Sequence, residues 1–247
     1  MAGAHPSDAE AFRPSVLPAL RQAVHELSWL LGRGYAEGAA ATLVGDHHQL
    51  EQRQRMAVRR CACDDRARAV RQARRVWPDA LGDRRVAVDT LNQLVTVERG
   101  LAGGAVLRGR DGALRDVAGV HGSWRRSDRT AEALDRMSRA LGPRAVTFVI
   151  DAPVSNSGRL AGLVRDRAAG RAWEVELAHP ADARLLDLGA EGWVVATADA
   201  GLLDRCPAWF GLAEVALSLA GGDRAPPTGE APLDRSEIPV IDLSVVR

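Results

Sequence analysis

Three short apolar runs and a fourth candidate strand, each followed by an acidic residue, constrain the fold of this chain more than any other feature. The apolar runs span residues 86–88, 146–150 and 193–196 and are followed by Asp89, Asp151 and Asp199, and the fourth candidate strand spans residues 173–177 and leads toward Asp182. Each run is too short for a helix, and its content of valine, isoleucine and tryptophan is typical of a buried strand. The pattern therefore predicts strands with carboxylates near their carboxyl ends.

Amphipathic stretches with helical periodicity separate these runs. They span residues 91–101, 128–141, 158–168 and 202–219. Strands that alternate with helices favour βαβ units. Residues 105–117 depart from this pattern, because Arg110-Asp111-Gly112 lies between two short runs and predicts a β-hairpin. We expect an α/β fold with a mainly parallel sheet flanked by helices.

A small all-α domain is expected before the sheet. Helical spacing of apolar residues begins at Val16, a second helix is expected over residues 37–44 before the Gly45-Asp46 break, and a third over residues 49–76 with a break near 63–65. The predicted division is a flexible lead-in at 1–15, an Arg-rich helical domain at 16–82, the α/β domain at 83–220, and a linker or tail at 221–247. Within that tail, residues 238–246 are apolar enough to add a strand.

Composition excludes several classes of protein. With 46% hydrophobic and 26% charged residues, the chain is neither collagen-like nor wholly disordered. It has no run of about 18 apolar residues and no recognisable signal peptide, so we expect no membrane partner. The three cysteines, Cys61, Cys63 and Cys206, cannot form a paired disulfide framework, which favours a cytoplasmic location.

The acids at the strand ends predict a metal site. Because the carboxyl ends of parallel strands meet at one edge of a sheet, Asp89, Asp151, Asp182 and Asp199 are expected to converge there, with Asp204 in support. Like charges at close range are unfavourable unless a cation or proton offsets them, and oxygen ligands favour Mg²⁺ or Mn²⁺ over Zn²⁺. The alternative is that each aspartate only caps the helix that follows it.

These residues also resemble motifs of NYN nucleases within the PIN-like superfamily. Residues 88–92 are similar to the first-strand motif, residues 149–151 to the second acidic strand end, residues 181–182 to the acidic position before the penultimate strand, and residues 197–204 to the Thr-x-Asp strand end. The resemblance covers about residues 85–210 and implies metal-dependent nuclease activity, in which Asn92 and Thr197 orient water or carboxylates. Thr90 departs from the motif, which usually has glycine there.

The whole chain also resembles an uncharacterised prokaryotic family. In that family a domain of unknown function 434 precedes a PIN-like half of the domain of unknown function 5616 type. Ser28-Trp29-Leu30-Leu31, Leu43-Val44-Gly45-Asp46 and residues 151–159 carry the resemblance. It implies a two-part organisation and no particular activity.

Two loops are candidates for substrate binding. Ser155, Asn156, Ser157 and Arg159 precede or open the helix after Asp151, where backbone amides and an arginine can bind phosphate; ordinary helix capping is the alternative. The second loop contains His121, Trp124, Arg125 and Arg126, which could transfer a proton, stack on a base or hold a phosphate. A plain surface loop with a packed tryptophan is the alternative there.

Arginine is concentrated in the predicted helical domain. Residues 53–85 contain eleven arginines against four aspartates, and only Asp64 and Asp65 lie within the helical stretch to pair with them. Arg53, Arg55, Arg59 and Arg60 are therefore expected to bind a nucleic-acid backbone. A solvated helix with internal ion pairs is the alternative. The absence of lysine is attributed to composition bias.

Several other sites are disfavoured. Cys61-x-Cys63 with His47 and His48 lacks the spacing and the second cysteine pair of a zinc site. The chain contains no P-loop, dinucleotide-binding loop or G-x-S-x-G elbow. Leu91 stands where a haloacid-dehalogenase-type site needs a second aspartate, and Gly201 where a Toprim-like site does.

The hypothesis from sequence is a divalent-metal-dependent nuclease of PIN/NYN-like type that acts on nucleic acid, RNA rather than DNA. Asp89, Asp151, Asp182 and Asp199 would hold one or two Mg²⁺ or Mn²⁺ ions. The alternative is a catalytically inactive nucleic-acid-binding or scaffold protein on the same fold.

Overall fold

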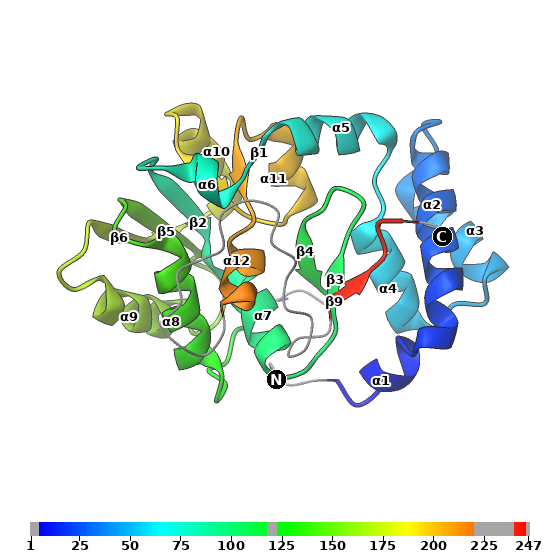
Figure 1. The fold of residues 1–247 in the computed structure, drawn as a ribbon, viewed down its shortest axis with the longest axis horizontal. Helices are drawn as coiled ribbons and strands as arrows, with labels where there is room; N and C mark the ends of the chain where they lie inside the picture. Colours follow the sequence, from blue (N-terminus) through cyan, green and yellow to red (C-terminus); the bar gives the residue numbers. More distant parts are fainter. Residues whose placement is uncertain (1–4, 118–122, 220–239, 246–247) are drawn as a thin grey trace.

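A six-stranded, all-parallel sheet forms the centre of the computed structural model, which describes residues 5–117, 123–219 and 240–245 (Figure 1). In spatial order the strands are β1 (Arg75–Val76), β8 (Trp209–Phe210), β7 (Val194–Ala196), β2 (Val86–Asp89), β5 (Val146–Asp151) and β6 (Trp173–Ala178). Val88 lies opposite Phe148 of β5 on one side and Ala196 of β7 on the other. The predicted α/β fold class and its four strands are confirmed.

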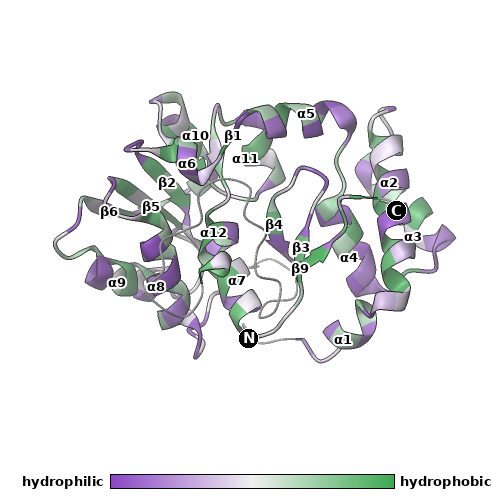
Figure 2. Cartoon of the chain, viewed as in Figure 1, coloured by the Kyte–Doolittle hydropathy of each residue, from purple (hydrophilic) through white to green (hydrophobic). Residues whose placement is uncertain are grey.

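Helices cover both faces of this sheet. Apolar side chains of α7 (Thr90–Leu101), α8 (Thr130–Leu141), α9 (Ser157–Ala168) and α12 (Leu212–Ser218) pack in one core with side chains of the strands. A separate core contains apolar side chains of α10 (Ala181–Ala190) and α11 (Ala200–Arg205). Figure 2 shows the strands β2 and β5 as mainly hydrophobic and the helices as mixed, which is the pattern of a sheet buried on both faces. None of the described helices combines the length and apolarity that crossing a bilayer requires.

The N-terminal region is helical up to residue 73. It contains α1 (Asp8–Ala11), a 3₁₀ turn (Pro14–Val16), α2 (Leu17–Leu31), α3 (Glu37–His47), α4 (Gln52–Cys61) and α5 (Asp65–Ala73). The helices α1 to α4 have their own apolar core, to which Leu107 and Leu243 also belong. The predicted break near 63–65 is present, because α4 ends at Cys61 and the Asp64 carboxylate caps α5 by accepting the Ala67 N–H at 2.8 Å.

A three-stranded sheet lies between the helical region and the large sheet (Figure 1). β3 (Val106–Arg108) and β4 (Leu114–Asp116) form the predicted hairpin, and Gly112 adopts a φ of 86° in its turn. β9 (Val240–Asp242) adds to β3 in parallel, so the tail predicted at 221–247 contains a strand. Residues 220–239, which include most of the predicted linker, lie outside the described residues.

Four boundary predictions need correction. The predicted lead-in contains α1 and buried residues, because the Asp8 carboxylate accepts hydrogen bonds from Arg53 and the Ala105 N–H, and Ala11 and Phe12 belong to an apolar core. Gly45 and Asp46 do not end α3, which runs to His47. The sheet begins at β1, before the predicted boundary at 82. The helix expected over residues 202–219 is divided into α11, β8 and α12, since Trp209 and Phe210 pair with β7 and β1.

A buried ionic cluster connects these parts of the molecule. Asp111, in the hairpin turn, accepts two hydrogen bonds from Arg115 of β4 at 2.7 and 2.8 Å and one from Arg71 of α5 at 2.7 Å. All three side chains are almost completely buried. Although burial alone would raise it, the guanidinium groups of Arg115 and Arg71 hold the pKa of Asp111 well below its ordinary value. The carboxylate is therefore ionised throughout the physiological pH range.

We expect the substitution Asp111→Asn to reduce the free energy of unfolding by roughly 3–5 kcal/mol, because it leaves the buried Arg115 guanidinium without a counter-charge and Arg71 with Asp204 as its remaining carboxylate partner. Equilibrium unfolding in urea would measure this change. Asp65→Asn is the matched control, since Asp65 also pairs with an arginine, Arg110, but its side chain is 86% exposed; we expect a change below about 1 kcal/mol there. Equal effects of the two substitutions would contradict the structural role of Asp111.

Candidate functional site

The strand order places a change of winding direction at β2 and β7. From β2 the chain continues to β5 and β6 on one side, then returns to β7 and β8 on the other. In open α/β sheets, ligands bind outside the carboxyl ends of the strands at such a switch point. Asp89 ends β2, and Thr197 and Asp199 follow β7, so three of the sequence-predicted residues lie at this position.

Hydrogen bonds tie the loop after β7 to β2 and α7. Thr197 Oγ1 donates to Asp89 Oδ2 at 2.8 Å and accepts the Asp199 N–H at 3.1 Å. Asn92 Oδ1, one turn into α7, accepts the Ala198 N–H at 3.0 Å. The Asp199 carboxylate caps α11 by accepting the Leu202 N–H at 3.1 Å. Thr197 and Asn92 thus orient the two acids of the switch point.

The acids at this edge influence one another electrostatically. Burial, followed by the charges of Asp199 and Asp182, raises the pKa of Asp89 to about 7, against the opposing hydrogen bond from Thr197. Burial and the charges of Asp199 and Asp151 likewise raise the pKa of Asp182. Asp89, Asp151, Asp182 and Asp199 therefore lie in a single cluster, the edge acids.

The edge acids lie near the switch point, but their carboxylate oxygens do not converge on a single position. Among the described residues, no three of them bring carboxylate oxygens within 4.8 Å of one another; the group that meets this distance is Glu26, His47 and His48 in the helical region. Asp204, predicted as a supporting ligand, lies at the far end of α11 from Asp199. Its carboxylate accepts hydrogen bonds from Arg71 Nε and Nη2 at 2.7 and 2.8 Å, so Asp204 is not one of the edge acids.

One residue at this edge was not singled out from the sequence. His179 follows β6, and its Nδ1 lies 3.7 Å from Asp151 Oδ1. Its side chain is 69% exposed, so it is accessible to a bound ligand. A histidine two residues after the candidate strand at residues 173–177 is the sequence signal that could have found it, because the same reasoning selected the acids.

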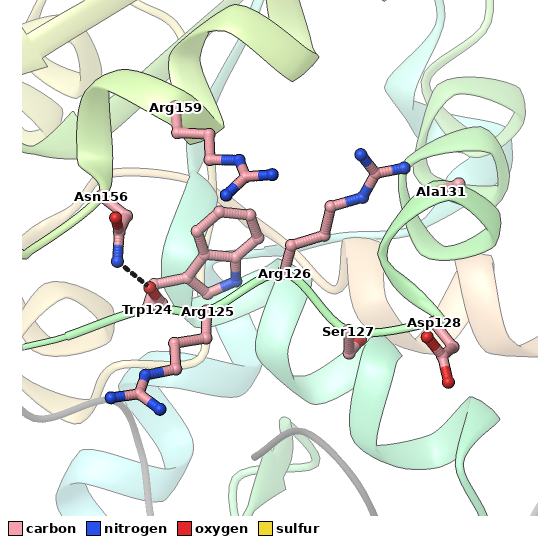
Figure 3. A pocket seen from close by; sticks show the side chains of 8 residues that line it. All are labelled: Trp124, Arg125, Arg126, Ser127, Asp128, Ala131, Asn156 and Arg159. Atoms are coloured by element: carbon pink, nitrogen blue, oxygen red, sulfur yellow. Dashed lines mark hydrogen bonds between the residues drawn. The ribbon is translucent and has the colours of Figure 1, made fainter.

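A pocket of about 700 Å³ opens beside the loop that follows Asp151 (Figure 3). It is lined by Trp124, Arg125, Arg126, Ser127, Asp128, Ala131, Asn156 and Arg159. Asn156 Nδ2 donates to the Trp124 carbonyl at 2.9 Å, and the Trp124 N–H donates to the Ser155 carbonyl at 3.1 Å. The two predicted substrate-binding loops are therefore side by side. They lie at the strand-end edge, because α9 begins where β5 ends.

The residues of these loops have different roles in the structure. Ser157 Oγ donates to the Ala152 carbonyl, which stabilises the turn before α9. The Trp124 side chain is only 2% exposed and belongs to the core, so its ring is not available for stacking on a base. Figure 3 shows the guanidinium group of Arg159 beside that ring and that of Arg126 extending toward the helix that carries Ala131. His121 lies outside the described residues.

The four arginines that were predicted to bind a nucleic-acid backbone are ion-paired in the structure. Carboxylates from outside the stretch reach each of them: Arg53 pairs with Asp8, Arg55 with Asp46, Arg59 with Glu37 and Arg60 with Asp116. The count of Asp64 and Asp65 as the available partners was therefore wrong. In contrast, Arg125, Arg126 and Arg159 are exposed, and none of them has a carboxylate partner within the described ranges.

Comparison with known proteins gives families without an assigned activity. Residues 78–215 match the family described as "Domain of unknown function (DUF5616)", and residues 19–74 match the one described as "Protein of unknown function (DUF434)". No curated protein and no solved structure matches the chain. The two matches divide the chain between α5 and β2, as the resemblance to a two-part family predicted.

We expect the substitution Asp89→Asn to stabilise the protein at pH 8. Because the pKa of Asp89 is about 7 when folded and about 4 when unfolded, the folded state binds the proton more tightly, and stability falls as the pH rises from about 4 to about 7. The asparagine amide is neutral at every pH, so the variant does not lose stability in this way. We expect a gain on the order of 2 kcal/mol at pH 8 that decreases toward pH 4, measured by urea unfolding at several pH values. A pH-independent difference would contradict the raised pKa.

Proposed function

We propose a metal-dependent nuclease activity for this chain, which belongs to the family described as "Domain of unknown function (DUF5616)". The observation that carries the proposal is the cluster of four edge acids at the switch point of a parallel sheet, with the pKa of Asp89 raised to about 7. Both features favour a cation at this position. The similarity of the same residues to PIN/NYN-like motifs supports the proposal independently.

The donor set fits Mg²⁺ or Mn²⁺. All four side chains offer oxygen, and Mg²⁺ commonly binds through one or two carboxylates while it keeps several waters. The absence of a close trio among the edge acids is compatible with that mode. A bound ion of this kind supplies Lewis-acid stabilisation and an activated water for cleavage of a phosphodiester. Asp89 and Asp199 are its principal ligands in this proposal, with Asp151 and Asp182 beside them.

The remaining residues would position the reacting groups. Thr197 holds one Asp89 oxygen through its hydrogen bond and would thereby fix the orientation of this carboxylate toward a ligand. Asn92 holds the loop that carries Asp199. His179, beside Asp151 and exposed, can donate a proton to the leaving oxygen or accept one from the water.

The substrate would be a nucleic acid, with RNA preferred by the resemblance. Arg125, Arg126 and Arg159 are suited to phosphate contacts, because they are exposed and charged and line a pocket next to the acid-bearing β5. We assign the pocket to the backbone rather than to the bases, since the Trp124 ring is buried. The alternative function is nucleic-acid binding without catalysis, which the open spacing of the edge acids favours.

Cleavage of labelled single-stranded RNA and DNA by the full chain, with Mn²⁺ or EDTA, tests the activity. We expect Mn²⁺-dependent cleavage by the wild type and at least about a 100-fold lower rate for Asp89→Asn, because a metal contributes several kcal/mol to the transition state and each 1.4 kcal/mol is tenfold. Asp182→Asn should also lower the rate.

The matched control for Asp182→Asn is Asp187→Asn. Asp187 is exposed and lies on the same helix, α10, but is not one of the edge acids. This variant should retain the wild-type rate. Equal rates in Asp89→Asn and wild type would reject the nuclease proposal, whereas binding without cleavage of any substrate would establish the alternative function.

Binding of a single-stranded oligonucleotide tests the role of the pocket arginines. We expect the double substitution Arg126→Ala/Arg159→Ala to weaken binding and to lower the slope of log K against log salt by roughly 0.7 for each phosphate that is no longer neutralised. Fluorescence anisotropy at several salt concentrations would measure both. Arg59→Ala is the control, because Arg59 is exposed but paired with Glu37. An equal loss of affinity in Arg59→Ala would instead locate the binding surface on the helical region.

A further inference from the structure

Two histidines and a glutamate meet at one end of the helical region. Glu26 lies on α2, His47 is the last residue of α3, and His48 follows it. One ligand atom from each lies within 4.8 Å of the other two, and His48 Nε2 is 2.8 Å from Glu26 Oε2. Figure 1 shows α2 and α3 at the opposite end of the molecule from β5 and β6, so this group is distinct from the edge acids.

We propose that Glu26, His47 and His48 bind one transition-metal ion of the zinc class. Two imidazoles and a carboxylate form a nitrogen-rich donor set that Mg²⁺ and Ca²⁺ disfavour and Zn²⁺ accepts. Ligand atoms about 2.1 Å from a tetrahedral ion are about 3.4 Å apart, so small rotations of these side chains would bring them onto one ion.

The contacts around the group resemble an ordered ligand shell. Gln22, one turn earlier on α2, donates from Nε2 to Glu26 Oε1 at 2.9 Å, which leaves Oε2 for the ion. The ion would replace the hydrogen bond between His48 Nε2 and Glu26 Oε2. Gln22 then has the role of the outer partner that orients a ligating carboxylate.

The position in the fold also favours a cation. His47 and His48 are at the carboxyl end of α3, an eleven-residue helix, where the helix dipole places partial negative charge. His47 is exposed whereas Glu26 and His48 are half-buried, so a fourth coordination position would face solvent. Three protein ligands with one open position is the arrangement of a zinc site that can bind water or a small ligand.

The cysteines are not part of this site. Cys61 and Cys63 are buried, and burial raises the pKa of the Cys61 thiol to about 12 and that of Cys63 to about 11. Neither thiol belongs to the group of ligand atoms that lie within 4.8 Å of one another. The donor set is therefore the one that the two helices provide.

Titration of the full chain with Zn²⁺ alone tests this proposal. The chain would first be treated with EDTA and desalted, and the calorimetric titration made in excess Mg²⁺ so that the edge acids do not compete for Zn²⁺. We expect one Zn²⁺ per chain. Binding should be lost in His47→Ala/His48→Ala and weakened about 10–100-fold in Gln22→Leu, the cost typical of losing an outer partner.

His25→Ala is the matched control, because His25 is the exposed neighbour of Glu26 on α2 and lies outside the group. It should bind Zn²⁺ like the wild type. Visible absorption of the Co²⁺-loaded chain gives a second measurement, and thermal melting shows whether each variant is folded. Absence of Zn²⁺ binding by the wild type, or equal binding by folded His47→Ala/His48→Ala, would overturn the proposal.

Discussion

The ion pairs of Asp111 fix how the helical region, the hairpin and the large sheet are placed relative to one another. This one buried carboxylate accepts hydrogen bonds from Arg71 of α5 and from Arg115 of β4. Arg71 continues to Asp204 of α11, and Arg115 Nε donates to the Ala198 carbonyl after β7 at 2.8 Å. Buried charges must be neutralised and hydrogen-bonded where they lie. None of these segments can therefore shift without leaving a charge uncompensated.

The same cluster reaches the candidate site. Ala198 stands between Thr197 and Asp199; its carbonyl accepts from Arg115, and its N–H donates to Asn92. The loop is thus held from the hairpin on one side and from α7 on the other. A site needs side chains held in position before the ligand arrives. In this molecule the N-terminal helices contribute to that positioning through Arg71 and Asp111, although none of their residues is an edge acid.

Features that depend on local sequence pattern could be predicted from the sequence. Features that depend on partners distant in the sequence could not. Strands β2, β5 and β7 follow from short apolar runs and β6 from a fourth candidate strand, and the edge acids follow from their positions after these segments. The partners of the α4 arginines were missed, since they lie outside the Arg-rich stretch: Asp8 is 45 residues from Arg53, and Asp116 is 56 residues from Arg60. The helix expected over residues 202–219 was wrong for the same reason, because pairing with β7 and β1 overrides the local periodicity.

These ion pairs explain how the near-neutral net charge of the chain is distributed over the structure. Most of the arginines of the helical region neutralise carboxylates, whereas Arg125, Arg126 and Arg159 are left exposed at the edge where four aspartates gather. An all-oxygen cluster beside free guanidinium groups suits a hard cation and a phosphate together. The two histidines at the end of α3, together with Glu26, suit a softer ion. Among the described contacts, no exposed arginine lies beside their ligand atoms. The two donor sets therefore favour different metals, and Zn²⁺ binding that persists in excess Mg²⁺ would be assigned to the helical region.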